Sequence, residues 1–396
     1  MNAAAPDQGA DHSVGTRYLD AAATAPLRPE ARAAMLAVYD GGQANASSVH
    51  QPGHRVKSIV QRARAAIAVA FGVPPAEVVF TSGGTEANNL AIIGLALANP
   101  RGRHLVTTPI EHPSVLRSVE YLERVFGFET TRVPVDGDGL VDPADIAAAL
   151  RDDTTLVSVA LANGEIGTVQ PTAEIAQVVR DRGALFHVDA VQAAASLPLN
   201  FSDDSDSWPG PVDAVSLASH KIGGPQGAGA LLVRRDLPLE PLLHGGGQEN
   251  GRRSGTENAA GIAGFGAAAR AMNGEVATRA LEIMVSRDAL IEGVLDRVRG
   301  ARLTGHASER LPGHASFVVE GQSGESMLVA LDAAGFAASS ASACAAGKDE
   351  PSPTLLSMGY DPDLARTAIR FTLSAPLDVA TVDRIVEVLR REVKNA

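Results

Sequence analysis

The feature that most constrains the fold is an alternation of short apolar runs with longer amphipathic segments across the first two thirds of the chain. Apolar runs predict buried strands, and the segments between them predict helices; the runs lie at residues 78–80, 104–107, 156–161, 184–189, 214–217 and 230–233. Strands joined by helices usually pair in parallel, with helices covering both faces of the sheet. The sequence therefore predicts an α/β fold around a mostly parallel sheet.

The last third of the chain has a different pattern and predicts a second, smaller α/β domain. Residues 258 to about 299 are alanine-rich and predict a long helical connector, and short strands are expected near 315–320 and 367–373. We expect a large domain over residues 17–265, whose first residues pack with the small domain, and a small domain over residues 266–396. Residues 1–16 lack the features of a signal peptide, and we expect a disordered tail there.

The composition indicates which kinds of partner and which cellular compartment to expect. The 34 basic and 46 acidic residues give a net charge of −12, which argues against nucleic acid as the main partner. No apolar run is long enough to span a membrane. The single cysteine, Cys344, allows no intramolecular disulfide, which fits a reducing cytoplasm. Pro and Gly separate His50 from His54, so no metal site is predicted.

The candidate chemistry centres on residues 216–229, where an apolar run ends in Ser219, His220 and Lys221 before a glycine-rich loop. An isolated lysine at the end of a strand would be interpreted as a surface residue. Two upstream features change that interpretation: a predicted strand ending at Asp189, and a glycine turn that opens a helix at residues 81–86. Together they supply what pyridoxal 5'-phosphate requires, namely a lysine for its aldehyde, a carboxylate for its ring nitrogen and a cradle for its phosphate.

Residue chemistry suggests individual roles around this lysine. The backbone N–H groups of Gly83, Gly84 and Thr85 would hold a phosphate at the start of a helix. His112 begins the next helix and would stack on the cofactor ring, or alternatively be a capping or core histidine. Arg370 lies inside an apolar strand, where a buried arginine needs a carboxylate partner, and a substrate carboxylate would serve. Cys344 lies in a run of small residues, where we expect a reactive thiol rather than a packed one.

The order and spacing of these motifs resemble the cysteine desulfurases, the NifS and IscS group of the class V aminotransferases. The resemblance runs from about residue 18 to the C-terminus and includes FTSGGTEANNLAI, EHPSVL, NGEIGTVQP, HVDAVQ, SHKIGGPQG, HGGGQENGRRSGT, SSASACAAG and IRFTLS. It implies a fold-type I enzyme with a seven-stranded sheet. It also implies conversion of L-cysteine to L-alanine, with the sulfur passing as a persulfide on Cys344 to an acceptor protein in iron–sulfur cluster assembly or thiolation.

The resemblance further implies a role for each site residue. Lys221 would hold the cofactor, Asp189 would pair with its ring nitrogen, and His112 would stack on the ring and help to move protons. The other cofactor contacts that it implies are Gly84, Thr85, Asn163, Gly164, Gln192, Ser219 and His220, with Thr256 reaching the phosphate of the other subunit in a homodimer. Arg370 and Asn45 would bind the substrate.

The chain departs from the family pattern at Gly164, where asparagine is usual, and at Ala218, where serine is usual. The cysteine loop also reads SSASAC instead of SSGSAC. Restoring both side chains at 164 and 218 is expected to tighten cofactor binding. Three alternatives remain: a selenocysteine lyase would use the same residues, an aminotransferase would leave Cys344 without a role, and a sulfur-relay scaffold would depend on partner binding more than on turnover.

Overall fold

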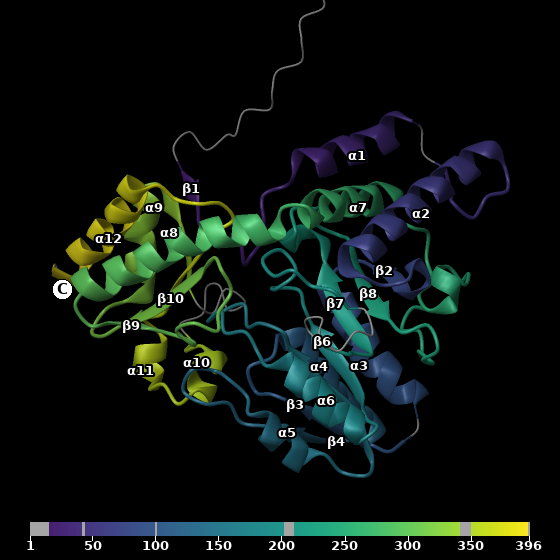
Figure 1. Cartoon of the computed structure of the whole chain (residues 1–396), viewed down its shortest axis with the longest axis horizontal. Helices are drawn as coiled ribbons and strands as arrows, with labels where there is room; N and C mark the ends of the chain where they lie inside the picture. Colours follow the sequence, from purple (N-terminus) through teal and green to yellow (C-terminus); the bar gives the residue numbers. More distant parts are fainter. Residues whose placement is uncertain (1–15, 42–43, 100, 202–209, 341–349, 395–396) are drawn as a thin grey trace, which may run out of the picture.

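A seven-stranded sheet forms the centre of the larger of two α/β units (Figure 1). The computed structural model describes residues 16–41, 44–99, 101–201, 210–340 and 350–394. The strand order is β2–β8–β7–β6–β5–β3–β4, with β2 (Val78–Thr81), β3 (His104–Thr107), β4 (Glu129–Arg132), β5 (Thr154–Ala160), β6 (Leu185–Asp189), β7 (Ala214–Ala218) and β8 (Gly229–Val233). In this sheet β8 runs in the opposite direction to the other six described strands, so the predicted mostly parallel sheet is confirmed.

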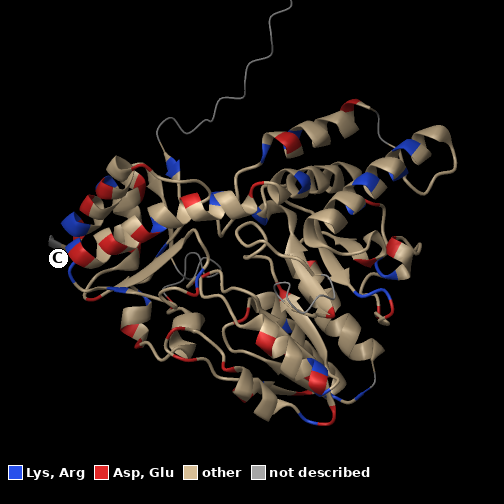
Figure 2. Ribbon diagram, viewed as in Figure 1, with Lys and Arg blue, Asp and Glu red and all other residues tan. Residues whose placement is uncertain are grey.

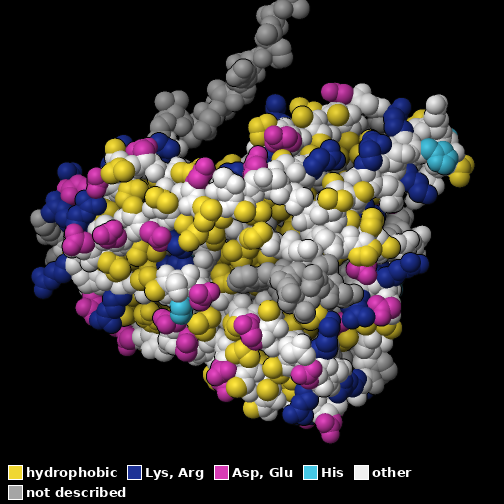
Figure 3. All heavy atoms as spheres, viewed as in Figure 1, with side chains coloured by type: hydrophobic (Ala, Val, Ile, Leu, Met, Phe, Trp, Pro, Cys, Tyr) yellow, Lys and Arg dark blue, Asp and Glu magenta, His cyan; other side chains and the backbone are white. Residues whose placement is uncertain are grey.

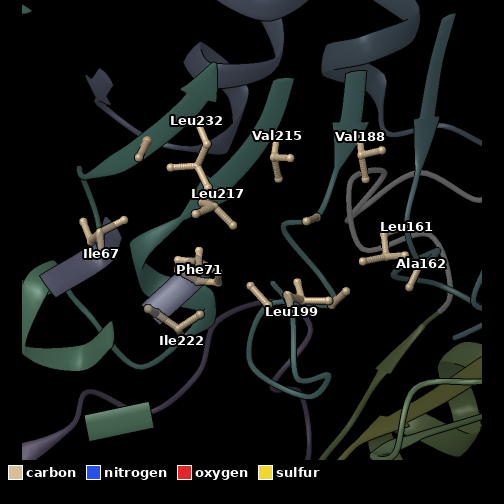
Figure 4. Packing of buried hydrophobic residues seen from close by; sticks show 14 of the residues in the cluster. Ile67, Phe71, Leu161, Ala162, Val188, Leu199, Val215, Leu217, Ile222 and Leu232 are labelled. Carbon is tan, nitrogen blue, oxygen red and sulfur yellow. The ribbon is translucent and has the colours of Figure 1, made fainter. Parts of the chain in front are cut away.

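Helices cover both faces of this sheet because its side chains alternate between two apolar clusters. Within β2, Val78 and Phe80 belong to one cluster, and Val79 belongs to the other. The first cluster includes side chains of α1 (Pro29–Asp40), α2 (Gln51–Phe71), α5 (Pro143–Ala149), α6 (Thr172–Asp181) and α7 (Ala259–Asn273). Figure 4 shows part of it, with Leu217 and Leu232 beside Ile67 and Phe71. The second includes α3 (Gly84–Ala98) and α4 (Pro113–Phe126).

The smaller unit is built on a four-stranded antiparallel sheet, β12–β13–β10–β9. Its strands are β9 (Ala301–Leu303), β10 (His314–Val319), β12 (Ser339–Ser340) and β13 (Ile369–Thr372), and its main helices are α8 (Val276–Arg297), α9 (Gly324–Ala333) and α12 (Val379–Lys394). The short helices α10 (Pro353–Ser357) and α11 (Pro362–Ala365) complete it. Strand β1 (Arg17–Tyr18) pairs with β11 (Phe336–Ala337), so the start of the described chain joins this unit.

The predicted helical connector is two helices, α7 and α8, separated at Gly274. The predicted domain boundary after residue 265 falls inside α7, because Ala268, Ala269 and Met272 still belong to the core of the larger unit. Ile283 of α8 already belongs to the core of the smaller unit. The chain therefore passes from the core of the larger unit to that of the smaller unit between α7 and the first half of α8. The division into domains stays a prediction. The predicted disordered tail, apart from its last residue, lies outside the described residues.

Acidic and basic side chains are interspersed over the outer helices (Figure 2). Apolar side chains gather along α8 on the face in Figure 3. Exposed apolar residues of this helix include Leu281 at 66% and Val285 at 72%. None of the helices in the described ranges combines the length and apolar character that a membrane crossing needs.

Candidate active site

The predicted site residues come together at one edge of the seven-stranded sheet. Asp189 is the last residue of β6, and Asn163 and Lys221 follow the carboxyl ends of the neighbouring strands β5 and β7. His112 follows β3, the next strand along. Parallel strands place their carboxyl ends at a common edge, which is where open α/β sheets bind ligands.

Lys221 is held against the beginning of the chain. It ends a short turn of 3₁₀ helix, Ser219–Lys221, directly after β7. Its Nζ donates hydrogen bonds to the carbonyl oxygen of Ala22 and, at 3.1 Å, to that of Ala23. Gln192 Nε2 donates to the same Ala22 oxygen at 3.2 Å. The N-terminal segment therefore brings backbone oxygens to the lysine amine and to the predicted cofactor contact Gln192.

Asp189 is buried and accepts two hydrogen bonds. Asn88 Nδ2 donates to Oδ2 at 2.7 Å, and the Val191 N–H donates to Oδ1 at 2.9 Å. A buried carboxylate held in this way is the partner that a protonated pyridine nitrogen requires.

His112 is both a helix cap and a neighbour of the other two groups. Its Nδ1 accepts the N–H of Ser114 at 3.1 Å as the N-cap of α4, and Ser114 Oγ lies 2.6 Å from the same nitrogen. Burial lowers the pKa of His112; the carboxylate of Asp189 opposes this effect, and the charge of Lys221 adds to it. The capping interpretation is therefore right, and the same ring still faces the charges of the predicted site.

The turn before α3 has the form of a phosphate cradle. The helix begins at Gly84, and its N-cap residue, Gly83, has no side chain that could bond the first N–H groups of the helix. A Cβ at Gly229 of β8 would lie 2.6 Å from the Cα of Gly83, so only glycine allows this close packing. Thr85 is exposed in the first turn. Backbone N–H groups at the start of a long helix are suited to an anion.

A buried hydroxyl beside Lys221 supports the same assignment. Among the described residues, no group bonds Ser219 Oγ, although this atom is buried. Burying a hydroxyl without a partner is costly unless a ligand completes it. The lysine, the carboxylate, the cradle and this hydroxyl together fit pyridoxal 5'-phosphate.

Arg370 reaches the site from β13 of the smaller unit. Its NH1 donates to the Gly164 carbonyl oxygen at 2.9 Å, and its NH2 pairs with Asp20 Oδ1 at 2.7 Å. Within the described chain, Nε is buried and has no partner. The carboxylate partner expected for this arginine is thus partly supplied by Asp20, and the Nε–H is among the donors that remain for a ligand.

Two further predicted contacts have local partners. Asn163 Nδ2 donates to the Ile110 carbonyl oxygen at 2.8 Å, and its Oδ1 accepts the N–H groups of Glu165 and Ile166. This asparagine therefore ties the loop after β5 to the loop before α4. His220 Nδ1 lies 3.2 Å from Thr24 Oγ1, and burial followed by the charge of Lys221 lowers its pKa to about 4.

The two positions that depart from the family have different surroundings. A Cβ at Gly164 would lie 2.6 Å from Gln192 Nε2, so the glutamine side chain already fills that space. Ala218 lies beside the cradle, because a Cβ at Gly84 would be 3.3 Å from the Ala218 methyl group.

Two predicted residues, Asn45 and Thr256, lie exposed in loops away from the ends of the sheet strands. Asn45 is exposed in the loop between α1 and α2, where its Oδ1 accepts the Ser47 N–H at 2.8 Å. Thr256 is exposed in the loop before α7, and the same loop is tied to α3 through the ion pair of Arg253 with Glu86 at 2.8 Å. Cys344 lies outside the described residues.

Two polar partners in this site, Asn88 and Asp20, were not predicted from the sequence. Asn88 follows Gly84 by four residues, so helical spacing places it on the face that carries the glycine turn. Asp20 carried no comparable signal, because its partner Arg370 is 350 residues away in the chain.

Comparison with known proteins agrees with this geometry. The family of aminotransferases of class V matches residues 17–385. An IscS-like cysteine desulfurase of Mycobacterium tuberculosis is 42% identical over 96% of this chain and 96% of its own length. A solved NifS-like protein has a TM-score of 0.88 at 31% identity, covering 96% of this chain and all of its own. The structure of SspA in complex with cysteine gives 0.79 at 31% identity, covering 92% and 100%.

The chain therefore belongs to the class V aminotransferase family. Within that family it belongs to the cysteine desulfurases, and the resemblance found in the motifs is confirmed.

Proposed function

We propose that this protein is a pyridoxal 5'-phosphate-dependent cysteine desulfurase that converts L-cysteine to L-alanine and carries the released sulfur as a persulfide on Cys344. The observation that carries the proposal is the convergence of Lys221, Asp189 and His112 at the carboxyl ends of β7, β6 and β3, with the incompletely bonded Arg370 reaching Gly164 from the smaller unit. The solved relative SspA, whose structure contains cysteine, supports L-cysteine as the substrate.

Different residues of the chain would bind the cofactor, orient the substrate and move its proton. When bound, the cofactor supplies an electron sink for the substrate's Cα electrons. Lys221 and Asp189 would hold it at its aldehyde and ring nitrogen, and Gly84, Thr85 and Ser219 would hold its phosphate. The Arg370 guanidinium would orient the substrate carboxylate by two parallel hydrogen bonds. The ion pair between Arg370 and Asp20 would have to loosen to free these donors. Lys221 Nζ would remove the Cα proton.

The sulfur transfer balances without an outside oxidant. The Cys344 thiolate attacks the sulfur of the substrate, an S–S bond forms, and the Cβ–S bond of the substrate breaks. The electron pair released at Cβ takes a proton. One enzyme thiol and one L-cysteine therefore give one enzyme persulfide and one L-alanine.

The test is alanine production by two variants that differ in the lysine removed. Lys221→Ala is expected to abolish turnover and to change the absorbance of any cofactor it retains. Lys57→Ala, at an exposed position on α2, is the matched control and should keep both. Normal alanine production by Lys221→Ala would overturn the assignment. Comparing kcat/KM for L-cysteine and L-selenocysteine separates the desulfurase from a selenocysteine lyase, and a scaffold role predicts full cofactor loading with little alanine.

We further propose a cytoplasmic homodimer that delivers its sulfur to an acceptor protein. Exposed apolar side chains on α1 and α2, among them Tyr39 at 50% and Val69 at 74%, support contact with a second copy. The exposed Thr256 would complete the partner's phosphate site, as its resemblance to the family implies. A lone thiol that must stay reduced supports the compartment.

Mixing inactive Lys221→Ala subunits with an inactive variant that lacks the Thr256 loop should restore part of the activity, because one hybrid site is then intact. If mixed dimers form without any restoration, each site is built from one chain.

A further inference from the structure

We propose that Asn88 and Ser114 are positioning residues that hold His112 as a neutral imidazole with its proton on Nε2. The assignment gains its chemical meaning from the proposed function, but it concerns a state of the protein that does not need turnover to be observed. It follows from a chain of hydrogen bonds that runs from Asp189 to His112.

This series of hydrogen bonds starts at the carboxylate of Asp189, whose oxygens act as acceptors. Carboxylate oxygens accept hydrogen bonds, so the atom of Asn88 that lies 2.7 Å from Asp189 Oδ2 is the amide nitrogen. This contact fixes the orientation of the Asn88 amide. Asn88 is 1% exposed and Asp189 is 6% exposed, so water competes little for either group.

The second hydrogen on Asn88 Nδ2 is directed at Ser114. Its donor distance to Ser114 Oγ is 2.9 Å. One lone pair of the serine oxygen is thereby occupied, and its hydroxyl hydrogen is free to point at a different acceptor. That acceptor is Nδ1 of His112, 2.6 Å from Ser114 Oγ.

The same nitrogen of His112 also accepts from the backbone. The Ser114 N–H donates to Nδ1 at 3.1 Å, as expected for a residue that caps a helix. A proton on Nδ1 would point at this N–H and would break the cap. Two donors therefore converge on Nδ1, and the proton of the neutral ring must lie on Nε2.

The surroundings also disfavour the charged ring. Burial and the charge of Lys221 lower the pKa of His112, and Asp189 is the group that opposes them. The positive end of the α4 dipole acts in the same direction as Lys221. The neighbouring carboxyl of Glu111 points elsewhere, accepting from Thr108 Oγ1 at 2.7 Å and from the Ala160 N–H at 2.8 Å.

This arrangement defines what His112 does in the reaction. A neutral ring with hydrogen on Nε2 donates a hydrogen bond to the site from that atom and does not accept there. His112 is then the donor of the pair, and removal of the substrate's Cα proton falls to Lys221. A neutral histidine at a helix N-terminus is suited to this work as an electrophile.

The experiment is a ¹⁵N titration of the histidine rings in the full-length protein, with and without cofactor. The chain has ten histidines, and His112→Gln identifies the signals of His112. The wild-type ring is expected to show the shift pattern of hydrogen on Nε2 at neutral pH. Ser114→Ala removes one donor to Nδ1, so the pKa of His112 should rise by about half a unit to one unit. Asn88→Ala should move it in the same direction.

Two variants make the result specific. Ser118→Ala is the matched control, because this buried serine on the same helix donates to the Ser114 carbonyl oxygen at 2.7 Å. It should leave the His112 signals unchanged, and Ser114→Thr, which keeps a hydroxyl, should restore the wild-type pattern. A wild-type ring with hydrogen on Nδ1, or one that is charged at neutral pH, would overturn the proposal. So would unchanged His112 signals in folded Ser114→Ala and Asn88→Ala. Absent alanine production with the expected ring pattern would count against the proposed function alone.

Discussion

Arg64 and Arg370 are both buried arginines that face a carboxylate, yet of the two only Arg370 has a buried nitrogen without a partner in the described residues. Arg64 makes two parallel contacts with Glu249, of 2.8 and 2.7 Å, and its guanidinium lies 4.6 Å from the ring centroid of Phe80. The Phe80 N–H donates to the same carboxylate at 2.9 Å. Arg370 makes one contact with Asp20, and its Nε has no partner in the described residues.

The difference separates a structural ion pair from a binding group. The Glu249 side chain is 3% exposed, and its pair with Arg64 joins α2 to a turn in which Glu249 has a φ of 49°. A complete pair of this kind holds an unfavourable backbone in place. The Asp20 side chain is 18% exposed, and Arg370 lies between the two units, beside Gly164. An incomplete pair at such a position leaves donors for an incoming carboxylate.

The largest expected effect is on folding, at the complete pair. Glu249→Gln leaves the Arg64 guanidinium buried without a counter-charge, which should lower the free energy of unfolding by about 3 to 5 kcal/mol. The KM for L-cysteine of the folded fraction should not change. Chemical denaturation and steady-state kinetics measure the two quantities. A greater loss of stability in Arg370→Gln than in Glu249→Gln would reverse the comparison.

The next effect is on catalysis, at the incomplete pair. Arg370→Gln should lower kcat/KM for L-cysteine by about 100-fold, or roughly 3 kcal/mol, mostly through KM. Arg370→Lys keeps the charge without the planar fork and should fall between this variant and the wild type. Steady-state kinetics with L-cysteine measures both variants. Wild-type kinetics in Arg370→Gln would make Arg370 a structural residue like Arg64.

A third test concerns Glu111, a buried carboxyl whose hydrogen-bond donors are Thr108 and Ala160 and not an arginine. Burial raises the pKa of Glu111 from its ordinary value of 4.5 to about 8, while bonds from Thr108 and Ala160 lower it. Because the folded pKa lies above the unfolded one, the stability that Glu111 contributes is fully present below pH 4.5 and is lost as the pH rises to about 8.

Glu111→Gln should therefore flatten the dependence of unfolding free energy on pH across that window, by about 1.4 kcal/mol per pH unit. Denaturation at a series of pH values measures the slope. Glu174→Gln, at an exposed position on α6, is the control and should leave the slope unchanged. An identical slope in Glu111→Gln and wild type would mean that Glu111 is ionised in the folded protein.

The smallest effect concerns cofactor affinity at the two departures from the family. Ala218→Ser places a hydroxyl beside the cradle and should tighten cofactor binding by about tenfold, or roughly 1.4 kcal/mol. Gly164→Asn must push the Gln192 side chain aside and should bring no gain by itself. The dissociation constants of the refilled proteins test both. Tighter binding in Gly164→Asn and none in Ala218→Ser would show that the two positions have been assigned the wrong way round.

Much of the fold follows from local apolar patterns, and the exceptions have physical reasons. The buried strands are continuous apolar runs, but the edge strand β4 reads ETTR and is polar enough to resemble a loop. The break between α7 and α8 at Gly274 is hidden in an alanine-rich segment that favours helix on both sides. Neither feature leaves a strong periodic signal.

The site also contains residues that the sequence predicts and residues that it does not. Lys221, Asp189 and His112 follow predicted strands, so topology alone brings them to one edge of the sheet. The partners that hold them depend on segments that fold together from far apart: 101 residues separate Asn88 from Asp189, and 350 separate Asp20 from Arg370. The sequence contains these residues but does not indicate which groups they meet.

The most direct test of the central claim follows the sulfur atom itself. The full-length enzyme, loaded with cofactor, is mixed with L-cysteine labelled with heavy sulfur, and the peptide that contains Cys344 is measured by mass spectrometry alongside the alanine formed. We predict labelled persulfide on Cys344, one alanine for each sulfur transferred, and no persulfide in Cys344→Ser. Alanine formed without labelled sulfur on Cys344, or an equal persulfide signal in Cys344→Ser, would contradict the account.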